Sequence, residues 1–111
     1  MNTLFDKDVA LPSARTTGEF LGKSREALDA LAAKHRLPLL SKFVALDWHD
    51  PALGATALRA LSAAVAAGEG DFERRALLLG ELADLIARLE SAASQGARFR
   101  FEVANKDVDV T

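Results

Sequence analysis

The hydrophobic residues of this chain recur mostly at intervals of three and four positions, which is the spacing of one face of an α-helix. The pattern is sustained over three segments, near residues 17–35, 51–67 and 71–95. The third segment carries the broadest apolar stripe: Leu78, Leu79, Leu82, Leu85, Ile86 and Leu89. We therefore expect three main helices.

Residues at the ends of these segments are typical of helix boundaries. Asp50 before Pro51 predicts a helix start, because an Asp cap accepts backbone N–H bonds and Pro at the first position needs no donor. Gly68 ends that helix, Asp71 is expected to cap the next one, and Gly96 fits the position just after its end.

The second and third helices are separated by a short Gly-containing segment, so the sequence predicts an αα-hairpin over about residues 51–95. The first helix has a Thr16/Glu19 pair at capping-box spacing, and Pro38 follows its C-terminal end. Between the first and second predicted helices, Phe43–Leu46 is a short apolar run that fits either a buried strand or one helical turn.

After Gly96 the period of the pattern changes from 3.6 to two. One side of the segment near 97–103 carries Phe99, Phe101 and Val103, and the other carries Arg98, Arg100 and Glu102. This alternation predicts a half-buried strand, which needs a hydrogen-bonded partner to be stable. We expect that partner in Phe43–Leu46 or in the N-terminal arm.

The expected fold is mainly α: a three-helix core with the hairpin and a short C-terminal strand that pairs with one other short segment. The 111 residues fit a single domain, 1–111, with an arm at 1–15 and a polar tail at 105–111.

Composition narrows the function classes. With a net charge of −2 and no basic stripe, the chain offers no surface for nucleic acid. It has no apolar run near the roughly 20 residues that span a bilayer. Asp6, Lys7 and Asp8 lie where a secretion signal would need an apolar segment. Together with the absence of cysteine, this predicts a cytoplasmic protein with no membrane association.

The densest chemical cluster is Asp47-Trp48-His49-Asp50. A His between two carboxylates can act as a general base or a metal ligand. The simpler interpretation is that Asp50 caps a helix, Trp48 packs on it and His49 is a solvated linker residue. The chain shows no nucleophile–base pair, metal-ligand spacing or phosphate loop, so we expect no enzyme activity, no metal and no cofactor.

Two further features bear on packing and binding. Gly22, Gly54 and Gly80 fall inside predicted helices, where glycine costs about 1 kcal/mol relative to alanine, so we expect close packing at these positions.

Arg98 and Arg100 form either a solvated strand face or a docking surface for an acidic partner.

Four elements carry a resemblance: Phe43-Val44, Trp48-His49-Asp50-Pro51-Ala52, Leu58-Arg59-Ala60-Leu61 and Gly96-Ala97-Arg98-Phe99. Their order resembles a group of small uncharacterised bacterial helical proteins, over roughly residues 40–103. In general style these resemble the immunity proteins of polymorphic toxins, which implies inhibition of a toxin by protein–protein interaction.

We therefore expect a cytosolic binding protein that masks a toxin or effector domain, with a contact surface formed by Asp47, Trp48, His49 and Asp50. Trp48, the single tryptophan, would be the buried anchor, and the two carboxylates would complement a basic partner. The alternatives are a helical homodimerising scaffold and a small-ligand regulator with a pocket near Trp48. The sequence leaves monomer and homodimer undecided.

Overall fold

The computed structural model describes residues 2–12, 19–44 and 47–102. Its elements in chain order are β1 (Asn2–Phe5), α1 (Glu19–Lys23), α2 (Arg25–Lys34), the 3-10 helix η1 (Leu40–Val44), α3 (Pro51–Ala66), α4 (Arg75–Ser94) and β2 (Phe99–Glu102). The mainly α fold with a short C-terminal strand is confirmed. No helix in the described ranges is long and apolar enough to cross a membrane.

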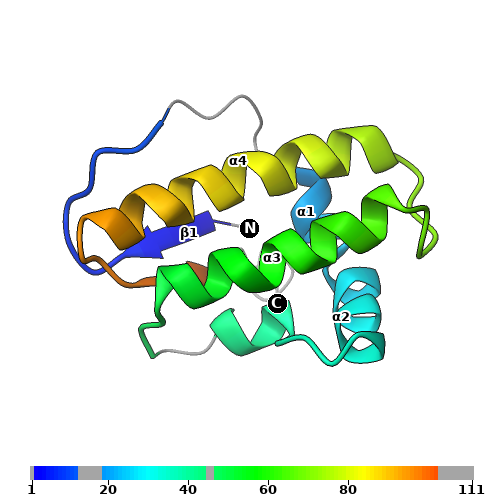
Figure 1. The fold of residues 1–111 in the computed structure, drawn as a ribbon, viewed down its shortest axis with the longest axis horizontal. Coiled ribbons are helices and arrows are strands. Elements are labelled where there is room, and N and C mark those ends of the chain that lie inside the picture. Colours follow the sequence, from blue (N-terminus) through cyan, green and yellow to red (C-terminus); the bar gives the residue numbers. More distant parts are fainter. Residues whose placement is uncertain (1, 13–18, 45–46, 103–111) are drawn as a thin grey trace, which may run out of the picture.

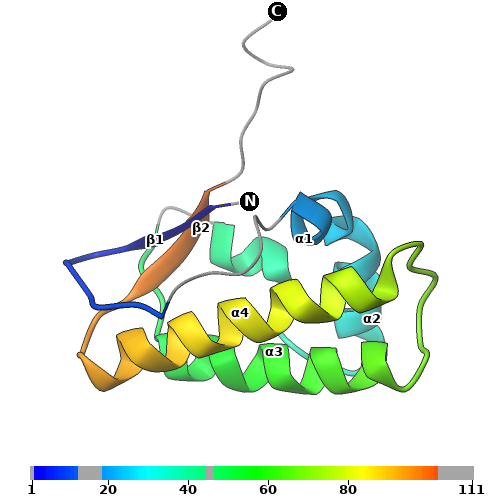
Figure 2. The ribbon, with the colours of Figure 1, turned by 90° about the horizontal axis from the view of Figure 1, so that it is seen from above.

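The α3–α4 hairpin forms one layer of the molecule (Figure 1). Its start agrees with the sequence, because Asp50 caps α3 by accepting a 2.9 Å hydrogen bond from the Ala52 N–H, with Pro51 at the first helical position. In the view of Figure 2, the strands, η1 and α1 lie on one side of this hairpin.

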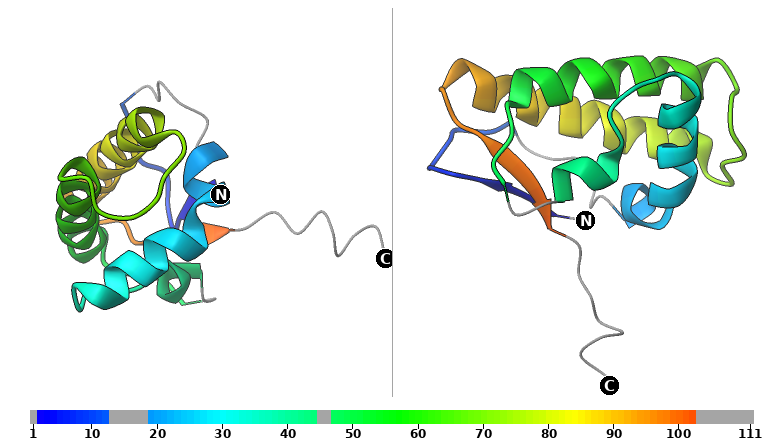
Figure 3. Two further views of the ribbon diagram at one scale, coloured as in Figure 1. Left: turned by 90° about the vertical axis from the view of Figure 1, so that its right-hand side faces the viewer. Right: turned by 90° about the horizontal axis from the view of Figure 1, so that it is seen from below.

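The single helix expected near 17–35 is divided at Ser24 into α1 and α2 (Figure 3). The carboxylate of Glu81 in α4 accepts hydrogen bonds from the backbone N–H groups of Phe20 (3.1 Å) and Leu21 (2.7 Å). These bonds fix α1 against α4, while α2 takes a separate direction toward η1. Residues 13–18, which include the expected capping Thr16, lie outside the described residues.

The predicted cap at Asp71 is wrong. The helix starts at Arg75, and the preceding residue, Arg74, provides no side-chain cap. The reason is tertiary: Phe72 is buried, and the Arg75 guanidinium donates to backbone carbonyls at the end of α3 and in the loop. The other end of α4 agrees with the prediction, since Gly96 has the left-handed backbone, at φ 72°, typical of the residue after a helix.

β2 pairs with the N-terminal arm: β1 runs antiparallel to it, with Phe5 opposite Phe99 and Asn2 opposite Glu102. The other expected partner, Phe43–Leu46, forms no strand where it is described, because Phe43 and Val44 belong to η1. Residues 45–46, Val103 and the tail at 105–111 lie outside the described residues.

Three aromatic rings join the strand layer to the hairpin. Phe43, Phe99 and Phe101 are almost completely buried, and their ring centroids lie 5.2 to 6.0 Å apart. Phe99 also lies against Gly54 of α3, where an added Cβ would come within 2.6 Å of the ring. The absence of a side chain at Gly54 therefore admits the ring, whereas a Cβ at Gly80 would meet no atom within 4 Å.

This difference predicts opposite effects of one substitution at two helical glycines. Gly80→Ala is expected to raise the free energy of unfolding by about 0.5–1 kcal/mol through helix propensity. Gly54→Ala is expected to lower it by about 1–3 kcal/mol, because the methyl group displaces the Phe99 ring. Urea unfolding of both variants measures the two signs, and a shift in the same direction would contradict the packing at Gly54.

Candidate functional site

Trp48 lies in the loop between η1 and α3, and the two residues that follow it are both anchored. His49 and Phe99 exchange two backbone hydrogen bonds of 2.8 and 2.9 Å, which attach the loop to the edge of β2. Asp50, the next residue, caps α3. The backbone directly after Trp48 is therefore held in place.

The Trp48 side chain is 38% exposed, and the Arg100 guanidinium lies over its ring at 5.1 Å from the centroid. Next to it is a cavity of about 380 Å³ between the start of α3 and the end of α4. The lining residues are Trp48, Asp50, Pro51, Ala93, Gly96, Ala97 and Arg98. The lining of this cavity thus combines apolar side chains with one acidic and one basic residue.

His49, unlike Trp48, is not exposed beside the cavity. Its ring is half-buried and meets the Phe43 ring edge-on, with centroids 5.1 Å apart. Its Nε2 is buried and has no hydrogen-bond partner within the described part of the chain. His49 is therefore a packed residue that fixes the loop, in contrast to the solvated linker residue that the simpler interpretation assumed.

The charges around Trp48 are mixed. Asp47 is exposed, and one carboxylate oxygen of Asp50 is occupied by the Ala52 N–H. Arg98 and Arg100 add positive charge to the surface expected to be acidic. The alternation along the strand already placed these two arginines on its outer side, but no sequence pattern showed that Arg100 stacks on Trp48.

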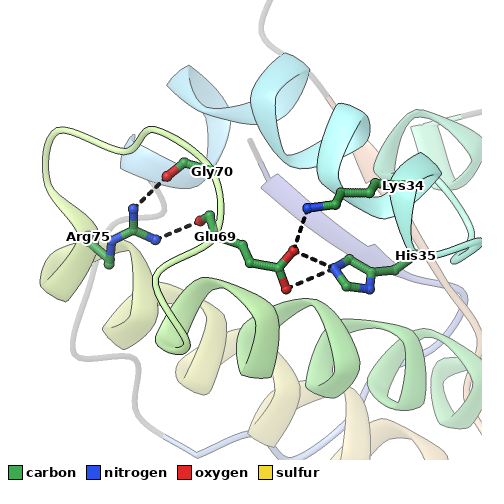
Figure 4. Close-up of polar contacts among 5 residues, drawn as sticks. All are labelled: Lys34, His35, Glu69, Gly70 and Arg75. Carbon is green, nitrogen blue, oxygen red and sulfur yellow. Dashed lines mark hydrogen bonds and ion pairs between the residues drawn. The ribbon is translucent and has the colours of Figure 1, made fainter.

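A second polar cluster ties α2 to the loop after α3 (Figure 4). The Glu69 carboxylate accepts hydrogen bonds from Lys34 Nζ and lies 2.9 Å from His35 Nε2. Arg75 donates to the backbone oxygens of Glu69 (2.7 Å) and Gly70 (2.6 Å). The cluster connects three segments and borders no cavity described here, so we assign it to stability.

This cluster predicts an acid-dependent loss of stability. Hydrogen bonds from Lys34 and then from His35 hold the pKa of Glu69 below its ordinary value of 4.5. A carboxyl with a lowered pKa stabilises the folded state above its unfolded value, and the stabilisation is lost as the pH falls through the folded value. Wild type should therefore melt above Glu69→Gln at pH 7, and the gap should close below about pH 4.5.

Thermal unfolding of both proteins across this pH range measures the gap. Glu102→Gln, at the exposed end of β2, is the control and should melt like wild type throughout. A gap between wild type and Glu69→Gln that persists unchanged at pH 3 would contradict the assignment.

The described residues include no group of three or more His, Asp or Glu side chains positioned to hold a metal ion. Comparison of the chain with models of protein families, with curated proteins and with solved structures finds no match.

Proposed function

We propose that this chain is a cytosolic immunity-type protein that binds a toxin or effector domain and masks its active surface, without catalysing a reaction. The observation that carries the proposal is the half-exposed Trp48, stacked by Arg100 beside an open cavity on an anchored loop. The centre of the contact surface comprises Asp47 and Trp48, and the surface extends to Arg98 and Arg100. His49 and Asp50 fix the loop that carries Trp48.

Two physical arguments support this surface. Tryptophan and arginine are the residue types that contribute most often to the energetic centre of protein interfaces. Two backbone hydrogen bonds to Phe99 hold His49, and the cap of α3 holds Asp50. The backbone directly after Trp48 therefore has little conformational freedom left to lose on binding. The cavity offers space for one side chain of the partner next to the Trp48 ring.

The mixed charge changes the expected chemistry of the partner. A partner of only basic character would meet Asp47 but also Arg98 and Arg100. A partner surface that pairs a basic group with Asp47 and an acidic group with Arg98 complements both signs. This requirement favours specific recognition over attraction by net charge.

A second candidate function, a homodimerising scaffold, rests on the outer face of the α3–α4 hairpin. Leu53 and Leu77 are 51% and 47% exposed there. The other exposed apolar positions on the two helices include Ala52, Ala60, Ala63, Ala76, Ala83 and Ala87. The charged residues Arg59 and Glu90 form an ion pair with each other, so this face has little net charge to oppose a second copy.

Light scattering and co-expression separate the two functions. The immunity function predicts a monomer that forms a complex with, and protects cells from, a toxin domain encoded beside its gene. The scaffold function predicts a tight homodimer that Leu53→Glu dissociates. The proposed function would be contradicted if the protein neither protected cells from any toxin domain encoded beside its gene nor bound any of these domains in purified form.

A further inference from the structure

A second and larger cavity, of about 460 Å³, lies at the other end of α4 from Trp48. The bend between α1 and α2 lines it on one side, and the residues at and before the start of α4 line it on the other. Its lining residues are Phe20, Lys23, Ser24, Ala27, Asp71, Phe72, Glu73, Arg74 and Leu78. None of these belongs to the surface around Trp48.

The lining of this cavity combines apolar side chains with polar and charged ones, and specific contacts fix its two aromatic walls. Phe72 and Leu78 are buried, and Phe20 is half-buried. The Phe20 wall is held by the Glu81 carboxylate, which accepts the Phe20 N–H at 3.1 Å and is itself only 4% exposed.

The Phe72 wall depends on the loop before it. Phe72 folds back over Gly70, whose backbone has a φ of 75° and whose added Cβ would lie 2.4 Å from the ring. Arg75 holds this arrangement, because its guanidinium donates to the Gly70 carbonyl and lies over the Phe72 ring at 5.4 Å. Both aromatic walls are thus positioned without a ligand.

The rim of the cavity carries both signs of charge. Lys23 and Arg74 supply two cations, and Asp71 and Glu73 supply two carboxylates. Lys23 also pairs with Glu19 at 2.9 Å on the exposed side of α1. A ligand with a single charge would leave half of these groups without a complement.

We propose that this cavity binds a small zwitterion with an apolar side chain, that is, a free apolar amino acid. Its side chain would lie against Phe20, Ala27 and Phe72, where burial of apolar surface is favourable. Its ammonium group would face Asp71 and Glu73, and its carboxylate would face Lys23 and Arg74. The cavity volume lies within the range of small-molecule sites, about 300–1,000 Å³.

Three matched probes test the proposal by isothermal titration of the full chain: L-phenylalanine, 3-phenylpropionate, which lacks the ammonium group, and 2-phenylethylamine, which lacks the carboxylate. We expect saturable binding of L-phenylalanine, and binding at least about tenfold weaker for each of the other two, because each leaves charged groups unmatched. Equal binding of all three probes would overturn the claim that the cavity recognises both charged groups of a zwitterion. No binding of L-phenylalanine or L-leucine up to about 10 mM would overturn the claim that the cavity binds an apolar amino acid.

Two alanines of α2 provide matched variants. Both Ala27 and Ala30 are exposed, but only Ala27 lines the cavity. Ala27→Phe should fill the space and abolish binding of L-phenylalanine, whereas Ala30→Phe should bind it like wild type. Circular dichroism checks that both variants fold. Unchanged binding by folded Ala27→Phe, or equal loss in both variants, would place the ligand elsewhere and overturn the assignment. These outcomes do not depend on the function proposed for Trp48.

Discussion

Phe99→Ala is expected to lower the free energy of unfolding by about 3–5 kcal/mol, the range typical of a phenylalanine deleted from a core. Phe99 is fully buried, fills the space left by Gly54 and packs against Phe43 and Phe101. Its removal leaves a cavity at the point where the strand layer meets the hairpin. For a domain with about 5–15 kcal/mol of total stability, this is a large fraction.

Urea unfolding followed by circular dichroism measures the loss. Leu53→Ala is the control, since Leu53 is half-exposed on α3 and its truncation should change the free energy of unfolding by no more than about 0.5 kcal/mol. Comparable losses in the two variants would show that Phe99 is not the residue joining the two layers.

Glu81→Ala is expected to cost about 2–3 kcal/mol, because hydrogen bonds to a buried charged group are worth more than those between neutral groups. Glu81 is buried, and its two carboxylate oxygens accept the N–H groups of Phe20 and Leu21. Alanine leaves both donors unpaired and releases α1 from α4. Amide hydrogen exchange should therefore accelerate at Phe20 and Leu21 well beyond the change at Leu61 in the core of α3.

Glu90→Ala is the matched control on the same helix. Glu90 is exposed and pairs with Arg59 at the surface, so its loss should leave exchange at Phe20 and Leu21 unchanged. Unaltered exchange of these two amides in Glu81→Ala would refute the role of Glu81 as the anchor of α1.

The parts of the fold predicted from sequence are those set by neighbouring residues. The start of α3 follows from Asp50 and Pro51, which act within one helical turn. The inward direction of Phe99 and Phe101 follows from the alternation of a strand. Gly96 after α4 is likewise a local requirement of the backbone.

The parts of the fold that the sequence did not predict depend on side-chain contacts between different elements. The division at Ser24 accompanies the hydrogen bonds that α1 donates to Glu81, about 60 positions away. The late start of α4 depends on the contacts of Arg75 with the end of α3. Period and propensity are local quantities and carry no information about such bonds. For the same reason the choice of β1 as the partner of β2 stayed open between two segments.

In the candidate site, too, local features were predicted from the sequence and contacts between elements were not. Its isolated tryptophan and the Asp50 cap were visible in the sequence, and Trp48 is exposed as a contact residue needs to be. The inward position of His49 and the stacking of Arg100 on Trp48 required the register of β2 against the loop, because Phe99 holds His49 in place. The pocket at the Phe72 end of α4 had no counterpart in the sequence, since two distant segments form it.

The most direct test of the proposed binding surface is the affinity of Trp48→Ala for a toxin domain encoded beside the gene, measured together with its melting temperature. The surface predicts an affinity loss of at least about 30-fold, equivalent to about 2 kcal/mol, with little change in melting temperature. Leu53→Ala, on the outer face of α3, should bind like wild type. A Trp48→Ala variant that melts many degrees lower yet binds with unchanged affinity would contradict the proposal and assign Trp48 to the packing of the fold.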